Sequence, residues 1–323
     1  PTSSSSGISR PGEAVSPEDL RDVPIAANAA EPPWRDLARH TAINPPGRAI
    51  HPGAAPKGDR LVYATTEFGT RPQIALKTVD GAASYQITSN SGENLFPRIS
   101  PDGKLVAYAS NRDGNWEIYL ARLDAPAAAT QITFEDVDDI APSWSPDGKR
   151  LVYCSKPADS TVWQIVIVEI GSRLKTYLGP GVYPDWSPDV KDPWICFQSQ
   201  PRTSGGRSTV WVARPDGTGL REIVGDKTRV WSAINPRFSP DGRWIAYATV
   251  NKSPESRAFG QPEAADDIWI VRPDGTLDTR LTDDLSAEWW PSWGGDRVFF
   301  VSDRGGARNL WSVRVKPLED PKE

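Results

Sequence analysis

Short apolar runs rich in β-branched and aromatic residues recur along this chain and are separated by turn signals. Residues 151–155 form one such run, which directly follows the Ser-Pro-Asp-Gly-Lys-Arg sequence at residues 145–150. This sequence suits a type I turn, because proline presets φ at the first corner and glycine accepts the left-handed position after it. The pattern therefore predicts two antiparallel strands joined by a tight corner.

The same corner recurs at a nearly fixed spacing. Further copies stand at residues 97–104, 184–191 and 236–243, with a weakened copy at residues 291–297. The leading prolines are 45, 42, 52 and 55 residues apart, a period that indicates a repeat architecture. Each corner is followed by a strand run that carries an aromatic residue at a matching place. The first of the six runs follows a degenerate corner at residues 56–60. These aromatic residues are Tyr63, Tyr108, Tyr153, Phe197, Tyr247 and Phe300.

A third strand run follows in each unit, and a shorter fourth run follows in all but the last. Six units of four antiparallel strands predict an all-β fold, a six-bladed β-propeller. Only polar residues follow the last unit, so its outer strand is missing. Ile43 precedes Pro52 by nine residues, close to the ten from Ile87 to Pro97, and on this alignment we expect residues 40–43 to supply the missing strand and close the ring. The predicted organisation is a flexible or extended tail at residues 1–39, the propeller at residues 40–316 and a C-terminal tail at residues 317–323.

These repeats resemble a known family. The Pro-x-aromatic-Ser-Pro-Asp-Gly-Lys corner, the Leu-Val-x-Tyr strand and the Ile-Tyr or Ile-Trp strand are similar to the WD40-like PD40 repeats of the TolB propeller family. The resemblance covers nearly all of residues 40–315 and implies a TolB-like six-bladed propeller. TolB itself carries an α/β domain before the propeller, where this chain has residues 1–39. Related propellers cover the hydrolase domain of prolyl oligopeptidases, but this sequence has no Gly-x-Ser-x-Gly elbow.

The net charge and the length of the most apolar stretch exclude some classes of partner and a membrane-spanning segment. The net charge is -5 and the basic residues are scattered, so the sequence has no electrostatic footprint for nucleic acid or an anionic membrane. The most apolar stretch, residues 162–168, is far too short to span a bilayer. The sequence begins Pro-Thr-Ser without the n-region and h-region of a signal peptide, so we expect that either a targeting signal has been removed or the sequence was trimmed. With the resemblance, we expect a periplasmic or cell-envelope protein whose tail is a linker or a tether.

Few residues suit catalysis. His40 and His51 are the only histidines, which excludes a three-histidine metal site and leaves a Ser-His-Asp triad dependent on one of these two. We therefore predict no catalytic residue. Cys154 and Cys196 fall in the second strands of neighbouring units, on sides that do not face each other, so we expect buried free thiols rather than a disulfide.

The long connections indicate where a partner binds. The Pro-Asp-Gly corners populate one face of the ring, whereas the linkers between units and the loops at residues 200–208 and 251–266 open on the other. Loops on a rigid scaffold commonly carry binding residues. The candidate binding residues on this face are Trp231, Trp289, Trp290, Glu135, Asp136, Asp138, Asp139, Asp283, Asp284 and Glu288.

Two interpretations of these residues stay open. The tryptophans either pack in the core or anchor a peptide near the ring axis. The acidic side chains are either simply solvated or attract a cationic partner or a hard cation such as calcium, for which no EF-hand spacing is present. We assign no metal ligand or cofactor from the sequence.

The function we expect is that of a non-catalytic scaffold of the bacterial cell envelope that binds a protein or peptide at the loop-rich face. One alternative is a structural subunit of a larger envelope or membrane-associated complex. Another is a propeller lyase or hydrolase that uses acidic residues. The fold does not separate these functions, but the scarcity of histidine favours binding.

Overall fold

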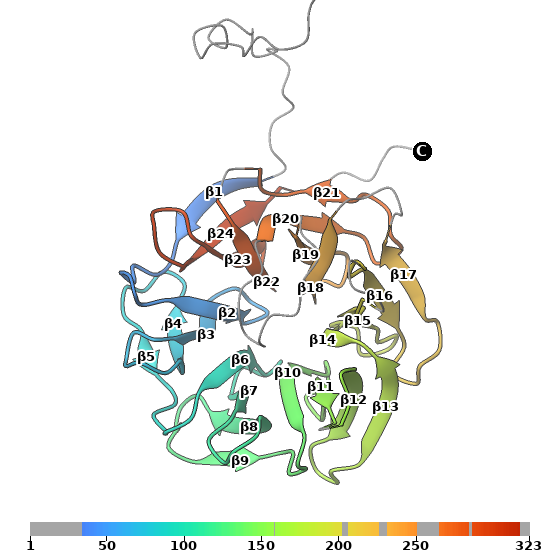
Figure 1. Cartoon of the computed structure of the whole chain (residues 1–323). Coiled ribbons are helices and arrows are strands. Elements are labelled where there is room, and N and C mark those ends of the chain that lie inside the picture. Colours follow the sequence, from blue (N-terminus) through green and yellow to red (C-terminus); the bar gives the residue numbers. More distant parts are fainter. Residues whose placement is uncertain are drawn as a thin grey trace, which may run out of the picture. The chain divides into compact units, whose positions relative to one another are not determined.

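The computed structural model describes residues 34–157, 159–201, 206–225, 231–250, 265–283 and 286–316. These residues form six four-stranded antiparallel sheets, and Figure 1 shows the sheets arranged as the blades of a ring. The predicted six-bladed propeller is therefore confirmed. Most of the predicted tail and all of residues 317–323 lie outside the described residues. Within the described part of the chain, no helix is long and apolar enough to cross a membrane.

Each blade uses four strands, and in blades 1 to 5 they run in chain order from the ring axis outwards (Figure 1). Blade 1 contains β2 (Ala49–Ala54), β3 (Arg60–Thr65), β4 (Gln73–Thr78) and β5 (Tyr85–Gln86). Blade 2 contains β6 (Asn94–Ile99), β7 (Leu105–Ser110), β8 (Glu117–Arg122) and β9 (Ala129–Gln131). Blade 3 contains β10 (Asp138–Trp144), β11 (Arg150–Lys156), β12 (Gln164–Glu169) and β13 (Lys175–Pro180).

The other three blades repeat this plan. Blade 4 contains β14 (Val182–Trp186), β15 (Ile195–Gln198), β16 (Val210–Ala213) and β17 (Arg221–Val224). Blade 5 contains β18 (Ser232–Phe238), β19 (Ile245–Val250), β20 (Ala265–Val271) and β21 (Thr279–Arg280). Blade 6 contains β22 (Glu288–Gly294), β23 (Arg297–Ser302), β24 (Asn309–Val315) and the N-terminal strand β1 (Trp34–Arg39).

The N-terminal strand closes the ring, as predicted, but from a different place in the sequence. β1 pairs antiparallel with β24, from Trp34 opposite Val315 to Arg39 opposite Trp311. The expected strand at residues 40–43 is wrong by several residues, so the propeller begins inside the predicted tail. Beyond β1, the His40 amide still donates to the Leu310 carbonyl at 2.8 Å, and from Thr41 to Ile43 the side chain of Asn309 replaces the backbone ladder.

Asn309 holds this segment by four hydrogen bonds. Its Oδ1 accepts from the Thr41 hydroxyl and from the Ile43 amide, each at 2.8 Å. Its Nδ2 donates to the Ile43 and Ala307 carbonyls at 3.1 and 3.3 Å. The Thr41 hydroxyl in turn accepts the Leu310 amide at 2.9 Å. The side chain of Asn309 is buried, so these bonds are shielded from water.

The same threonine bond recurs in other blades. Thr88, Thr133 and Thr282 each accept the amide of an isoleucine at the start of a third strand, as Thr41 accepts Leu310. Thr41 is therefore the equivalent of these threonines. The sequence alignment on Ile43 placed the outer strand too far along the chain, because the repeated element is the threonine rather than the apolar residue.

The cores of the blades lie between neighbouring sheets. The predicted second-strand aromatics are all buried, and five of the six are almost wholly removed from solvent.

The Pro-Asp-Gly corners join the first and second strands of their blades, and the polar groups of such a corner form hydrogen bonds with one another. At one corner the Ser100 hydroxyl donates to Asp102 at 2.6 Å, the same carboxylate accepts the Lys104 amide at 3.1 Å, and Gly103 has φ +72°. The corners therefore offer few free polar groups to a partner.

The buried bonds of Asn309 predict a test of ring closure. Replacing Asn309 by alanine is expected to lower the free energy of unfolding by about 2 kcal/mol or more, because the Ile43 amide and Thr41 hydroxyl lose buried partners. Chemical denaturation measures the loss. Asn44→Ala, at a nearby exposed position, is the matched control and should change stability little. Equal stabilities of the two variants would contradict the role of Asn309.

The two cysteines are free and buried, as expected from the sequence. Burial raises the pKa of the Cys154 thiol to about 12 and raises that of Cys196 as well. Both groups are therefore protonated and shielded at neutral pH. We expect the folded protein to resist a thiol reagent at pH 8 and to consume two equivalents after unfolding, as followed by mass spectrometry. Rapid labelling of either cysteine before unfolding would show that its strand opens in the native protein.

Candidate functional site

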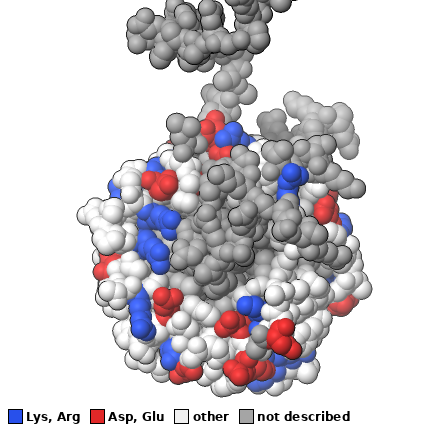
Figure 2. All heavy atoms as spheres, viewed as in Figure 1, with Lys and Arg blue, Asp and Glu red and all other residues white. Residues whose placement is uncertain are grey.

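The two faces of the ring differ in what they expose. We call the face that carries the connections between blades the linker face, including residues 132–137, and the face that carries the Pro-Asp-Gly turns the corner face. In the view of Figure 2, acidic and basic side chains are interspersed around the ring rather than gathered in a field of one sign. On the described part of this face, charge thus offers a partner local groups of side chains rather than a broad field.

The candidate tryptophans are packing residues. The relative solvent exposure is only 5% for Trp289 and 9% for Trp290. Trp290 lies edge-on to His51 at a ring distance of 4.3 Å, and Trp231, which is half-buried, packs against Trp269 at 5.4 Å. Neither Trp289 nor Trp290 offers an exposed ring to a partner, so the peptide-anchor interpretation of these two residues is wrong.

The second predicted acidic group is dispersed. Glu288 is buried and forms an ion pair with Arg304, whereas Asp283 is exposed. Asp284 lies outside the described residues. These residues therefore do not form a common acidic rim in the part of the chain that the structure describes.

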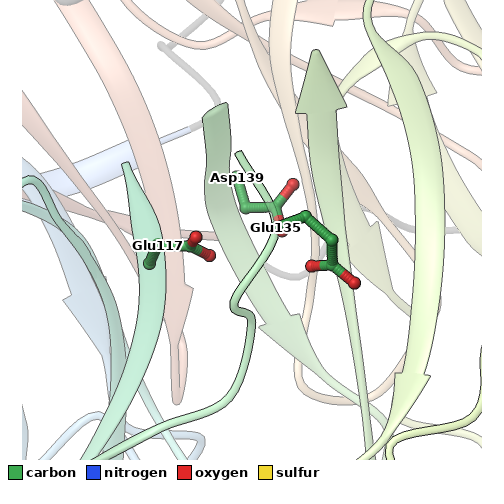
Figure 3. Close-up of side chains that lie close together, drawn as sticks. All are labelled: Glu117, Glu135 and Asp139. Carbon is green, nitrogen blue, oxygen red and sulfur yellow. The ribbon is translucent and has the colours of Figure 1, made fainter. Parts of the chain in front are cut away.

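The first acidic group is partly brought together, with one residue that the sequence did not single out. Glu135 in the linker and Asp139 in β10 meet Glu117, the first residue of β8, and one carboxylate oxygen of each lies within 4.8 Å of the others. Figure 3 shows these three side chains between neighbouring strands. Asp136 is exposed, and Asp138 is half-buried with its carboxylate accepting the Trp116 amide at 3.1 Å.

The three carboxylates have unequal partners. Glu117 accepts bonds from Asn115 Nδ2, at 2.9 Å, and from the Thr133 hydroxyl. Glu135 forms an ion pair with Lys175 of β13. Asp139 is fully buried and neither of its carboxylate oxygens has a hydrogen-bond partner. The hydroxyl of Tyr153, also buried, has none either.

Burial governs the acidity of this cluster. It raises the pKa of Asp139 to about 7, although the Ser155 hydroxyl beside it partly offsets this without the geometry of a full hydrogen bond. Burial also raises the pKa of Glu117. Burial opposes ionisation of Glu135 as well, but Lys175 and hydrogen bonds from backbone amides, that of Phe134 among them, together outweigh it and lower the pKa of Glu135. The cluster thus holds more negative charge than one lysine can balance.

The same position between blades 1 and 2 is neutral. Gln73 precedes the isoleucine that the threonine caps, as Glu117 does, and Asn94 pairs with Ser110 as Asp139 pairs with Ser155. Asn94 Nδ2 donates to Gln73 Oε1 at 2.9 Å. At this position two uncharged amide side chains therefore hydrogen-bond to each other.

Between blades 5 and 6 the position is acidic but neutralised by arginine. Asp267 and Glu288 occupy the two equivalent places. Arg280 lies 2.8 Å from the Asp267 carboxylate, and Arg304 pairs with Glu288. The cluster of Glu117, Glu135 and Asp139 has no arginine partner among the described residues.

Two exposed aromatic side chains flank the same cluster. Phe134, beside Glu135, is 65% exposed, and the Arg173 guanidinium lies 5.9 Å from its ring. Tyr177 is 66% exposed and projects from the same side of β13 as Lys175, two residues before it. We call Phe134, Glu135, Asp136, Lys175 and Tyr177 the aromatic–acidic patch. The sequence did not reveal it; its only local signal was an aromatic residue at the start of a polar linker.

The two histidines lie in packed surroundings. His51 is buried and stacks on Phe96 at a ring distance of 3.8 Å, and burial lowers its pKa well below the ordinary value. His40 has Nε2 2.8 Å from the Ser312 hydroxyl, and burial lowers its pKa to about 4. Both are therefore neutral at physiological pH.

The raised pKa of Asp139 predicts a pH dependence of stability. Between about pH 4 and pH 7 the folded protein keeps a proton that the unfolded chain has lost, so stability should fall as pH rises through this window, by up to about 1.4 kcal/mol per pH unit. Above pH 7 the slope should level off. In a chelating buffer, Asp139→Asn should lose most of this slope and keep the part that the raised pKa of Glu117 contributes, and thermal unfolding at pH 5 and 7.5 measures it. The exposed control Asp136→Asn should keep the slope; a slope unchanged in Asp139→Asn would contradict the assignment.

Comparison with known proteins supports a family assignment. A family model described as the TolB beta propeller domain, PD40, matches residues 39–200, half of the chain. A curated relative, the uncharacterized protein Atu1656 of Agrobacterium fabrum, is 34% identical over 136 residues. That match covers 40% of this chain and 39% of the relative, so it spans about two fifths of the relative's length.

Solved structures share the fold at low identity. A protein assigned as TolB from Agrobacterium tumefaciens has a TM-score of 0.61 and 22% identity, covering 84% of this chain and 92% of that chain. TolB from Acinetobacter baumannii has a TM-score of 0.56 and 19% identity, covering 80% and 64%. Oligogalacturonate lyase from Vibrio parahaemolyticus has a TM-score of 0.57 and 14% identity, covering 87% and 94%. Because one of these is a lyase, the fold alone does not separate binding from catalysis. The repeats, the six blades and the family model together show that this chain belongs to the TolB beta-propeller family.

Proposed function

We propose that this protein is a non-catalytic propeller of the bacterial cell envelope that binds a protein or peptide segment at the aromatic–acidic patch. The observation that carries the proposal is the exposure of Phe134, within the acidic linker, and of Tyr177, two residues from the Lys175 that pairs with Glu135. Large exposed aromatic rings are costly in water and are enriched among residues that dominate binding energy. The family membership supports an envelope location, and the proposal keeps the loop-rich face predicted from the sequence.

The charges of the patch indicate the kind of segment it would bind. Lys175 is engaged by Glu135, and Asp136 is exposed with no ion pair in the described residues. Among the patch residues the unpaired charge is therefore that of Asp136, while the Arg173 guanidinium lies over the ring of Phe134. A segment with an apolar side chain beside a lysine or arginine complements this arrangement, with the apolar group on the aromatic rings and the charge steering association.

The non-catalytic part of the proposal is supported by the surroundings of the histidines. His51 is neutral and stacked in the interior, and His40 is engaged at the ring closure. A general base needs contact with a substrate proton as well as a suitable pKa. Neither residue combines these properties in the folded protein.

The patch predicts which substitutions abolish binding. A tagged full-length chain is used to recover partners from envelope extracts of its source cell, and the affinity for the recovered partner is then measured with purified variants. The double variant Phe134→Ala/Tyr177→Ala should weaken binding by about 30-fold or more, the loss typical of aromatic hot spots. Because both rings are largely exposed, the variant should keep the melting temperature of the wild type.

Tyr85→Ala is the matched control, since Tyr85 is 64% exposed but lies on blade 1. It should bind the partner like the wild type. A partner that binds all three proteins equally would show that the patch is not the docking site. A recovered partner that is chemically altered by the protein would contradict the non-catalytic role.

A further inference from the structure

We propose that Glu117, Glu135 and Asp139 form a binding site for a divalent cation of the calcium type, which bridges blades 2 and 3. The proposal goes beyond the proposed function: the site shares Glu135 with the aromatic–acidic patch, but cation binding needs no partner protein. It rests on four features of the cluster: the spacing of its oxygens, its unsatisfied buried groups, its charge and its donor type.

The spacing suits a hard cation. One oxygen from each of the three carboxylates lies within 4.8 Å of the others. Calcium binds oxygen ligands at about 2.3–2.6 Å, so ligands on opposite sides of the ion lie about 5 Å apart. The three oxygens can therefore contact one ion with only small movements of their side chains.

Unsatisfied groups point to a missing positive charge. Both carboxylate oxygens of Asp139 are buried without a hydrogen-bond partner, and Figure 3 shows this side chain beside that of Glu135. The Tyr153 hydroxyl is also buried and unpartnered, and the charge of Asp139 contributes to raising its pKa. Leaving such groups without partners costs free energy, which a bound cation would recover.

The other blades show how this chain otherwise treats the same position. The Gln73–Asn94 pair carries no charge, and Asp267 and Glu288 each face an arginine. The cluster has three carboxylates and one ammonium group, and that group is already paired with Glu135. A divalent cation would supply the charge that arginines supply between blades 5 and 6.

The donor set selects the kind of ion. All the ligand atoms are carboxylate oxygens, which suit calcium, magnesium or manganese, whereas zinc and copper prefer nitrogen or sulfur ligands. The side chain of Glu135 is half exposed, so water can complete the coordination shell. A flexible shell with one ligand on a linker favours calcium over magnesium, which requires nearly ideal octahedral geometry.

The test is a titration of the full-length protein after treatment with a chelator. Calcium chloride is added at pH 7.5 and constant ionic strength, and the melting temperature is recorded together with binding heat by calorimetry. Calcium at about one hundred times its dissociation constant should raise the melting temperature by about 5 °C, with one ion bound per chain. Magnesium at the same concentration should have a smaller effect.

The variants locate the site. Glu117→Gln and Asp139→Asn should fold but lose both the calcium-dependent shift and the binding heat. Asp283→Asn, at an exposed acidic position outside the cluster and the patch, is the control and should keep both. A shift that persists in Glu117→Gln and Asp139→Asn, or the absence of any binding heat in the wild type at 10 mM calcium, a concentration above the range typical of extracellular calcium modules, would overturn the proposal. Because no partner is present, these outcomes are independent of the patch.

Discussion

The antiparallel pairing of β1 with β24 is the contact on which the ring depends. Each blade of a propeller buries both of its faces against neighbours, so joining the first and last parts of the chain within one blade stabilises the order of the blades. Here the join combines a backbone ladder from Trp34 to Arg39 with the side chain of Asn309, which replaces the ladder where the chain turns towards blade 1. Losing this join would expose an unpaired strand edge and the apolar faces beside it.

The closure also shows how this repeat is built. In four of the six blades a threonine just beyond the outer strand caps the third strand, and the residue before the capped amide projects into the space between blades. This position carries asparagine at the closure, glutamine between blades 1 and 2, and a carboxylate in two other places. The backbone fixes where the group lies, while its chemistry differs from blade to blade. A repeated structural position has thus become the place where one pair of blades acquires an excess of negative charge.

Much of the fold could be predicted because its signals are local. The Ser-Pro-Asp-Gly corner determines its own turn, and its recurrence sets the number of blades without any knowledge of long-range contacts. The second-strand aromatics follow from the same register, and all are buried. The N-terminal strand was misplaced because the alignment used an apolar residue, Ile43, where the structure repeats a hydrogen bond made by Thr41.

The site could be predicted only in part, because it depends on contacts between blades. In a propeller both faces of a strand are buried. Trp289 and Trp290 are therefore buried in the core, although each lies near a loop in the sequence. Glu117 looked like an ordinary strand residue, since nothing near it in the sequence indicates that Asp139 lies across the blade boundary. The sequence singles out Glu135 and Asp139 as acidic linker residues. Only the fold shows that Glu117 lies beside them.

Glu135 belongs to both proposed sites, and this has a physical consequence. Its carboxylate faces Glu117 and Asp139 on one side and Lys175 on the other, while the next residue towards the N-terminus is the exposed Phe134. A cation held by Glu117, Glu135 and Asp139 would fix the linker against β8 and β10. Part of the ordering cost of placing Phe134 against a partner would then already be met before binding. The two sites would therefore favour each other through the rigidity of a short linker, without any larger change in the six blades.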